Sequence, residues 1–586
     1  MQALGKVRNV LSAAEMKSLV LVLALMLAGM VFEMLGIGII LPIFAVITAP
    51  EKILNYPGGA DLFAKIGDLN QSDLVIYSLL IIAVFSVIKF FVLMALSYLQ
   101  SKTTYDILAG VSSRLYQSYL EAPYVFHLNS NSSQLIRNAT LEVQIFAQNL
   151  INPTLTLLAE ILVTLGVISV LLALNPKGTG LAMLFIGLLG LIFIRLTRQL
   201  SRRWGVARQY HEGKRIKIIQ EGLSCVKEIV LLDKTKFYAQ NYEKEAILSA
   251  TVAGRQVFMG QLPRLMLELI AALAICLIVW VNLKDGIDLA EILPFLVMFA
   301  AAAFRVLPSV NRILGAVNAI FYSYPSVKAL ISPPQNSDAE SMRIQDGGRQ
   351  NLEAFEAFEF KDLEFSYSES SGKAISGISL SFHKGEMIGF VGETGSGKST
   401  LLDLMLGLLK PTAGQTFVNG QPMQTQLPDW RKKIGYVPQT IALVDDTIRK
   451  NIAFGLSDSD IDDLKVASAL KIAQLDDFIK NLPEGVQTLV GERGVRISGG
   501  QRQRIGIARA LYHQPEIIFF DEATSALDNQ TEAELMQSIE ALHGNVTLVM
   551  IAHRLSSIMN CDRVYRLKNG RIIEQGVPAA ILKEGA

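Results

Sequence analysis

Six long apolar stretches occupy the first 330 residues and restrict the possible folds more than any other feature. They lie at about 18–48, 74–99, 150–174, 179–197, 265–283 and 288–310. A helix needs about 20 apolar residues to cross the hydrocarbon core, where its backbone polar groups must bond to one another. The mean hydropathy of +0.36 is also too high for an ordinary soluble enzyme. We therefore expect six membrane-spanning helices, the first retained because it is too long for a signal-peptide core.

The connections between these stretches are unequal in length and in charge. Residues 175–178 and 282–288 are short turns, whereas 100–149 and 198–264 are long, polar and compatible with helix. The second long segment is rich in Lys and Arg, so the positive-inside rule places both long segments, and both termini, in the cytoplasm. Each has a break, near 121–127 and near 222–230, that forms either a short transverse helix able to dock on a cytoplasmic domain or an ordinary loop.

A composition change marks the end of the membrane part. The segment Ser-Pro-Pro-Gln-Asn-Ser-Asp at 332–338, with two glycines at 347–348, is typical of a linker. We predict a transmembrane domain at 1–330, a linker at 331–352 and a second domain at 353–586. The net charge of +1 gives no basic field for nucleic acid, and the three scattered cysteines fit neither a metal site nor a disulfide framework.

The second domain contains a phosphate-binding loop between a predicted strand and a predicted helix. The sequence Gly-Glu-Thr-Gly-Ser-Gly-Lys-Ser-Thr at 392–400 fits the pattern G-x-x-x-x-G-K-[ST]. Its glycines let backbone N–H groups surround phosphates at a helix N-terminus. The predicted nucleotide-binding residues here are Gly392, Thr394, Gly395, Ser396, Gly397, Lys398, Ser399 and Thr400. Lys398 can reach the outer phosphates and Ser399 can hold Mg²⁺, so we expect a nucleoside triphosphate.

Further candidate residues lie on both sides of this loop. Tyr367 is placed to stack on an adenine ring, although a single aromatic residue in a strand is more often core packing. Gln439 offers an amide oxygen to Mg²⁺ or to the attacking water. A second glycine-rich helix start follows, with Ser498, Gly499, Gly500 and Gln501. Because one triphosphate needs one phosphate cradle, the second start indicates a nucleotide held by another copy of the domain.

Two carboxylates and a histidine complete the predicted catalytic set. Asp521 and Glu522 end an apolar strand: Asp521 suits the Mg²⁺ shell with Ser399 and Gln439, and Glu522 suits activation of the hydrolytic water. Acidic pairs are also common at helix starts, so in isolation this pair decides nothing. His553 follows another apolar strand and is placed to contact the γ-phosphate.

Together these motifs resemble the nucleotide-binding domain of ABC transporters over about 355–580. The resemblance includes Ser525–Asp528 and Gly491–Gly494; Ile497 stands where Leu is usual. It implies an α-helical six-span transmembrane domain with long cytoplasmic helix extensions, followed by an α/β P-loop ABC nucleotide-binding domain. It further implies a homodimer of half-transporters that uses ATP and Mg²⁺, with catalytic Glu522, His553 and Gln439. The protein would be a multi-pass component of the cytoplasmic (inner) membrane with its nucleotide-binding domain in the cytoplasm.

Three cations fall within or beside the predicted spans and bear on the transported molecule. Each of Lys89, Arg264 and Arg305 would cost roughly 2.5–3.5 kcal/mol at mid-membrane if uncompensated. In one interpretation they pair internally: Arg264 with Glu268 at i+4, and Lys89 or Arg305 with Glu33 or Glu160. In the other they line a wet cavity that receives phosphate or pyrophosphate on a lipid-linked substrate.

The membrane half also resembles bacterial lipid-linked oligosaccharide flippases of the Pgl type. The similar stretches are 32–44, 262–268 and 304–313. The resemblance implies that Lys89, Arg264 and Arg305 engage a pyrophosphate and that a polyprenyl-diphosphate oligosaccharide is flipped, with Lys89 where Arg is expected. The alternatives are an exporter of lipids, drugs or peptides, and a soluble ABC ATPase acting on nucleic acid or ribosomes. The six apolar stretches argue against the last.

Overall fold

The computed structural model describes residues 10–48, 71–174, 176–284, 289–331, 354–367, 372–522, 529–551 and 558–581. The chain divides into two compact units, which we describe one at a time. The first unit comprises Met1–Ala122 and Ser130–Gln335, and the second comprises Pro123–Asn129 and Asn336–Ala586. The second unit therefore includes a short segment from between the predicted second and third spans.

Six long helices dominate the described part of the first unit. They are α2 (Ala13–Thr48), α4 (Gln71–Leu120), α8 (Asn152–Leu174), α9 (Pro176–Ser224), α11 (Thr235–Lys284) and α12 (Leu289–Ile331). Each predicted span coincides with one of them, and the third begins within the π-helical turn η3 (Phe146–Ile151) that precedes α8. Three stretches of the described residues, Ala13–Gly36, Leu79–Leu120 and Ser132–Ser169, are long and apolar enough to cross a membrane.

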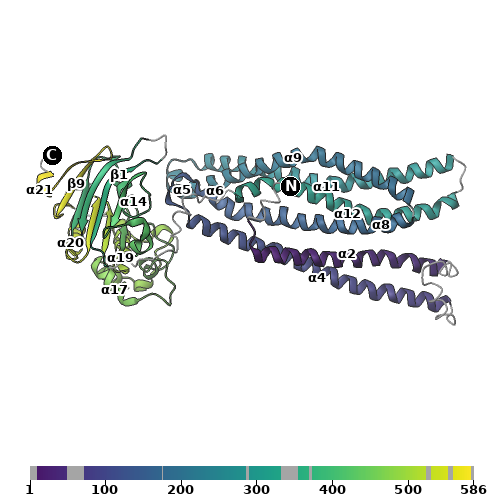
Figure 1. Cartoon of the computed structure of the whole chain (residues 1–586), viewed down its shortest axis with the longest axis horizontal. Coiled ribbons are helices and arrows are strands. Elements are labelled where there is room, and N and C mark those ends of the chain that lie inside the picture. Colours follow the sequence, from purple (N-terminus) through teal and green to yellow (C-terminus); the bar gives the residue numbers. More distant parts are fainter. Residues whose placement is uncertain are drawn as a thin grey trace. The chain divides into compact units, whose positions relative to one another are not determined.

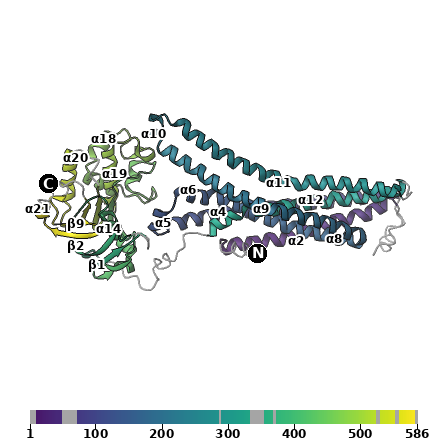
Figure 2. The ribbon, with the colours of Figure 1, turned by 90° about the horizontal axis from the view of Figure 1, so that it is seen from above.

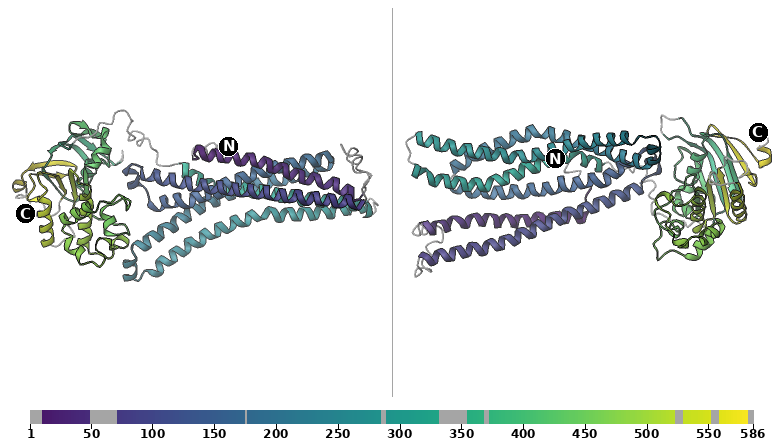
Figure 3. Two further views of the ribbon diagram at one scale, coloured as in Figure 1. Left: turned by 90° about the horizontal axis from the view of Figure 1, so that it is seen from below. Right: turned by 180° about the vertical axis from the view of Figure 1, so that it is seen from behind.

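Four of these helices run far beyond their apolar stretches, which confirms the predicted extensions. In Figures 1 and 2, α9, α11 and α12 run side by side, and α2 runs along α4. Figure 3 shows the same two groups from two further sides. Gly205 lets α9 approach α12 closely, because a Cβ at this position would collide with the carbonyl oxygen of Tyr322.

Short helices occupy both predicted breaks in the long segments. The first break contains α5 (Tyr124–Asn129), which belongs to the second unit, followed in the first unit by α6 (Ser132–Arg137) and the π-helical turn η2 (Asn138–Glu142). The second break contains α10 (Val226–Leu231), whose Val226 and Leu231 are exposed. Helices, not irregular loops, therefore stand at the two predicted tips.

A buried ion pair joins the segment after α5 to α9. Glu142 is fully buried in η2, and its Oε2 lies 2.9 Å from Nη2 of Arg208, itself buried on α9. Arg137 lies 3.7 Å from the other carboxylate oxygen, and Ser326 of α12 accepts a hydrogen bond from Arg208. Because buried charges are costly unless paired, this cluster connects three segments of the first unit through mutual neutralisation.

The second unit contains two β-sheets. The first is antiparallel, in the order β2-β1-β4-β5, and consists of β1 (Ala357–Phe365), β2 (Ile375–His383), β4 (Ala413–Val418) and β5 (Gln421–Pro422). The second has the order β10-β9-β3-β8-β7-β6 and is parallel except for β10 (Arg571–Gly576). Its outer strands also include β9 (Arg563–Lys568) and β6 (Ile434–Val437). Its central strands are β3 (Met387–Val391), β8 (Thr547–Ile551) and β7 (Ile517–Asp521), which are short apolar runs as expected for a parallel sheet covered on both faces.

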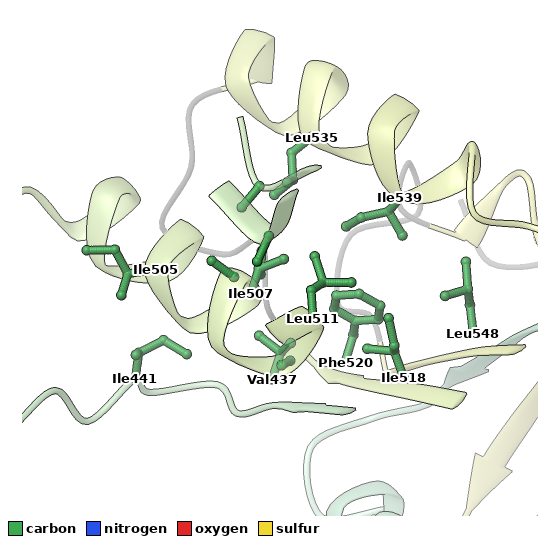
Figure 4. Close-up of a cluster of buried hydrophobic side chains, with 14 of the residues drawn as sticks. Val437, Ile441, Ile505, Ile507, Leu511, Ile518, Phe520, Leu535, Ile539 and Leu548 are labelled. Atoms are coloured by element: carbon green, nitrogen blue, oxygen red, sulfur yellow. The ribbon is translucent and has the colours of Figure 1, made fainter. Parts of the chain in front are cut away.

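Alternate residues of the parallel strands enter two different cores. Ile518 and Phe520 of β7 pack with α19 (Gly499–Tyr512) and α20 (Asn529–Glu540) on one face, as Figure 4 shows. Ile517 and Phe519 pack on the other face with α14 (Lys398–Met405) and the antiparallel sheet. Helices α14 and α19 thus lie on opposite faces of the sheet.

The buried ion pair predicts a specific pattern of stability changes. Replacing Arg208 with Met leaves Glu142 buried without its nearest cation, which we expect to destabilise the fold by about 3–5 kcal/mol. Adding Glu142→Leu removes the stranded charge and restores most of this loss. Thermal unfolding of the purified full-length chain measures both variants, and a double variant less stable than the single one would contradict the prediction.

Candidate nucleotide-binding site

The phosphate loop connects the buried strand β3 to helix α14 as the sequence predicts. Gly392 and Gly397 have φ angles of 153° and 103°, which side chains rarely adopt, and a Cβ on Gly397 would lie 2.9 Å from the carbonyl oxygen of Ala374. Lys398 curls back and donates hydrogen bonds to the carbonyl oxygens of Gly392 (2.7 Å) and Glu393 (3.0 Å). Burial lowers the pKa of Lys398, while the nearby charges of Glu522 and Asp521 oppose this shift.

The loop residues fit a phosphate ligand. Ser396 is only 4% exposed, and its Oγ has no hydrogen-bond partner in the described structure. A buried hydroxyl without a partner is costly, so its presence beside Lys398 is best explained by a ligand that bonds to it. Ser399 and Thr394 are exposed on the same loop. The donors offered by this loop are those that a triphosphate requires.

Tyr367 lies against the helix that follows the phosphate loop. Its hydroxyl is 3.0 Å from Oγ1 of Thr400, and its ring packs edge-on against Phe365 with a centroid distance of 5.0 Å. The residue nevertheless remains 42% exposed. Tyr367 therefore lies next to the phosphate loop with part of its side chain exposed, and its contact with adenine stays a prediction.

The predicted catalytic carboxylates lie at the carboxyl end of β7, at the edge of the sheet where the other parallel strands also end. Glu522 has a φ of 50°, unusual for a residue with a side chain, and its N–H donates to the carbonyl oxygen of Ile551 at 3.0 Å. Nε2 of Gln439 donates to Oε2 of Glu522 at 2.6 Å. This bond leaves the amide oxygen of Gln439 as the atom able to bind a metal ion. Asp521 is the neighbouring residue of the same strand.

Two residues that the sequence analysis did not single out adjoin this group. Burial and the charge of Asp521 raise the pKa of Asp403, on α14, to about 6. Burial, followed by the charges of Asp403 and Tyr367, raises the pKa of Tyr124, on α5 within the same unit. Asp403 lies one helical turn after Ser399. This i+4 spacing could have indicated from the sequence that Asp403 lies near the nucleotide-binding site. The sequence analysis allowed a docking helix near 121–127, but no pattern there singles out Tyr124.

The second glycine-rich helix start has the geometry of a capping box. Ser498 accepts a hydrogen bond from the backbone N–H of Gln501 (3.2 Å), and the Gln501 side chain accepts one from the N–H of Ser498 (2.9 Å). Ser498 and Gly499 are exposed, and Gly500 and Gln501 are half-buried. The start of α19 is therefore a well-formed, accessible helix N-terminus.

Arg509 and Asn451 tie α19 to the segment that follows Gln439. Arg509 donates to the carbonyl oxygens of Ala442 and Asn451, both at 2.8 Å, and to Oδ1 of Asn451 at 2.9 Å. The fully buried Asn451 side chain also bonds the N–H and the carbonyl oxygen of Val444, both at 3.0 Å. The position of α19 is thus linked to that of the segment after Gln439. Sequence reasoning missed both residues, because one Arg or Asn in a helix carries no distinguishing pattern.

The three membrane cations differ in their surroundings. Lys89 on α4 forms an ion pair with Glu33 on α2 at 2.8 Å, and Arg264 pairs with Glu268 at 2.8 Å while its side chain stays 71% exposed. Internal pairing is therefore confirmed for these two. Of the two acids suggested for Lys89, Glu33 is its partner, and Glu160 pairs with Arg312 at 2.5 Å. A pair between Glu160 and Arg305 stays a prediction. The side chain of Arg305, the residue His553 and the segment 525–528 lie outside what the structure describes.

Comparisons with known proteins agree with this fold. Residues 375–525 match the family model described as "ABC transporter", and residues 18–304 match "ABC transporter transmembrane region". A protein named ATP-dependent lipid A-core flippase from Ralstonia nicotianae is 30% identical, covering 83% of this chain and 82% of its own length. One of the same name from Saccharophagus degradans is 32% identical, with coverages of 80% and 79%. A solved bacterial Atm1-family ABC exporter with ATP bound has a TM-score of 0.76 over 98% of this chain and 97% of its own, at 21% identity.

A helical transmembrane region joined to an ATP-binding domain of this kind defines an ABC exporter. The chain belongs to the ABC transporters and is an exporter-type half-transporter. It is an ATPase whose hydrolysis is coupled to translocation across a membrane.

The unpartnered hydroxyl of Ser396 gives two opposite expectations for one substitution. Ser396→Ala removes a buried polar atom, so without nucleotide we expect unchanged stability or a gain of about 1 kcal/mol. The same change removes a donor to phosphate and raises the KM for ATP several-fold. Thermal unfolding without nucleotide and steady-state ATPase assays measure the two effects. An unchanged KM would show that the hydroxyl does not contact the nucleotide.

Proposed function

We propose that this chain forms a homodimer that flips a polyprenyl-diphosphate-linked oligosaccharide across the cytoplasmic membrane, driven by ATP. Each copy supplies a multi-pass domain, expected at 1–330, and a nucleotide-binding domain, expected at 353–586, on the cytoplasmic side. The single observation that carries the lipid substrate is Arg264, a cation beside a predicted span whose side chain stays 71% exposed despite its pairing with Glu268. The relatives named flippases support movement of a lipid in general.

The two glycine-rich helix starts support the proposed homodimer. Helices α14 and α19 pack on opposite faces of one sheet, which favours their use for different nucleotides. In the proposed dimer, the loop from Gly392 to Thr400 of one copy binds ATP against Ser498–Gln501 of the other. The capping box at Ser498 fixes the conformation of this helix start in advance, so the helix start need not reorganise when ATP closes the dimer.

The geometry at the end of β7 supports the proposed catalytic roles. Ser399, Asp521 and the amide oxygen of Gln439 would hold Mg²⁺, which when bound would neutralise charge on the β- and γ-phosphates. Glu522 would orient and polarise the attacking water, and its hydrogen bond to Gln439 would fix the carboxylate beforehand. Lys398 would exchange its bonds to Gly392 and Glu393 for the phosphates. His553 would contact the γ-phosphate.

The three membrane cations do not contribute equally to the proposed cavity. Lys89 is neutralised by Glu33 on the neighbouring helix, with only 26% of its side chain exposed, so its main contribution is to join α2 and α4. Arg264 has a partner on its own helix and remains open to an anion, which a bidentate guanidinium binds well. We therefore expect Arg264, together with Arg305, to engage the pyrophosphate.

Replacing the two arginines tests the proposed substrate. With Arg264→Ala and Arg305→Ala combined, we expect flipping of a polyprenyl-diphosphate oligosaccharide in proteoliposomes to fall at least tenfold, because each charge-assisted contact contributes about 1.5–3 kcal/mol. Basal ATPase activity should be retained. Arg255→Ala, on an exposed turn of the same helix α11, is the matched control. Flipping at the wild-type level in the double variant would refute the cationic cavity.

An exporter of drugs, other lipids or peptides is the alternative with the same fold. It predicts ATPase stimulation by apolar drugs and indifference to pyrophosphate lipids. Mass spectrometry of the lipid that co-purifies with the protein separates the two candidates, since only the flippase of polyprenyl-diphosphate oligosaccharides should co-purify with a lipid that contains pyrophosphate.

The dimeric ATP site can be tested by cross-linking. Replacing Cys225, Cys276 and Cys561 with Ser, then introducing Thr394→Cys and Ser498→Cys, places one thiol on each side of the proposed interface. We expect ATP with Mg²⁺ to increase disulfide formation several-fold, seen as a dimer on a non-reducing gel. Thr394→Cys alone is the control. Cross-links confined to single chains, or independent of ATP, would contradict the interfacial site.

A further inference from the structure

Three arginines form a stripe along one face of α9. Arg195, Arg198 and Arg202 are spaced i, i+3 and i+7, which places them on the same side of the helix, and all three are exposed. From Pro176 to His211, α9 contains no acidic residue. The stripe therefore has no carboxylate on its own part of the helix.

The same face is apolar in the turns that precede the stripe. Leu184, Leu188 and Leu191 share the helical phase of the arginines and are 70%, 55% and 67% exposed. Exposed leucines within a predicted span fit contact with lipid chains. The arginine stripe covers about 10 Å of helix directly after them, at 1.5 Å per residue. It therefore begins where this face leaves the hydrocarbon and meets the headgroup layer.

Aromatic rings of α12 hold two of the arginines. The guanidinium of Arg198 lies 5.4 Å from the ring centre of Phe321, and that of Arg202 lies 4.6 Å from that of Tyr324. Such stacking fixes the planar groups but does not cancel their charge. No ion pair to the stripe is present among the residues that the structure describes. The guanidinium groups are thus positioned, charged and free to bind an anion.

We propose that Arg195, Arg198 and Arg202 bind the phosphate headgroups of anionic phospholipids in the cytoplasmic leaflet. Arginine suits this role because its planar donors match phosphate oxygens and its stem packs along apolar surface. A phospholipid bound there lays its chains along Leu184, Leu188 and Leu191. The site rests on the membrane orientation proposed above, but not on the identity of the transported lipid. It is separate from the cavity assigned to Arg264 and Arg305.

Retention of phosphatidylglycerol tests the site directly. The full-length protein is exchanged into nanodiscs of phosphatidylcholine with 30% phosphatidylglycerol, re-extracted in mild detergent and analysed by native mass spectrometry. For the triple variant Arg195→Gln, Arg198→Gln, Arg202→Gln we expect bound phosphatidylglycerol to fall about fivefold per arginine removed. The matched control is Arg203→Gln, Lys244→Gln, Arg255→Gln, which removes the same charge from exposed positions off the stripe. It should retain phosphatidylglycerol as the wild type does.

A second measurement separates this site from a general electrostatic effect and from the proposed transport. The single variants Arg202→Gln and Arg203→Gln change adjacent residues of equal charge, and only the first should lower retention. Equal loss in both, or wild-type retention in the triple variant, overturns the proposal. An efficient Arg198→Cys cross-link between two copies would also overturn it, because the second copy would then cover the stripe. Failure to flip a pyrophosphate lipid would refute the proposed substrate and leave this result unchanged.

Discussion

Water is absent from the core of a bilayer, and that absence governs the first half of this molecule. A peptide group in hydrocarbon that is not hydrogen-bonded costs several kcal/mol, so each apolar stretch must satisfy its own backbone, and it does so as a helix. The helices α4, α9, α11 and α12 continue well beyond their apolar stretches. The long extensions place α5 and α10 far along the chain from any apolar stretch.

The same requirement explains why charge in this unit is paired locally. Lys89 meets Glu33 between two neighbouring helices, and Arg208 meets Glu142 between α9 and η2. Each pair fixes the spacing of the segments that it joins, because separating the partners would leave a charge buried. The α9 stripe of Arg195, Arg198 and Arg202 differs from these pairs. Its arginines are stacked on neutral rings, so their charge remains available.

Sequence patterns were sufficient for features that arise within one segment. Apolar runs located the six long helices, and the strand, glycine loop and helix located the phosphate cradle around Lys398. Contacts between distant segments could not be predicted. Asp403 approaches Asp521 only through the fold of the sheet, and Arg509 reaches Ala442 across 67 residues. The pairing of Glu160 with Arg312 was not predicted for the same reason: several cations were within plausible reach, and helix packing brings Arg312 to Glu160.

One short helix bears on how the chain divides into exchangeable parts. Tyr124–Asn129 is encoded between two membrane helices, yet it belongs to the compact unit that binds nucleotide, and Val125 packs against that unit's core. The order of segments along the sequence therefore differs from their division into compact units. A chimera that joins this transmembrane region to another transporter's ATPase would carry along the six residues of α5, which pack against this protein's own nucleotide-binding unit. An exchange of domains therefore needs to move this helix together with the nucleotide-binding unit. Recombination at the linker alone would separate the helix from that unit.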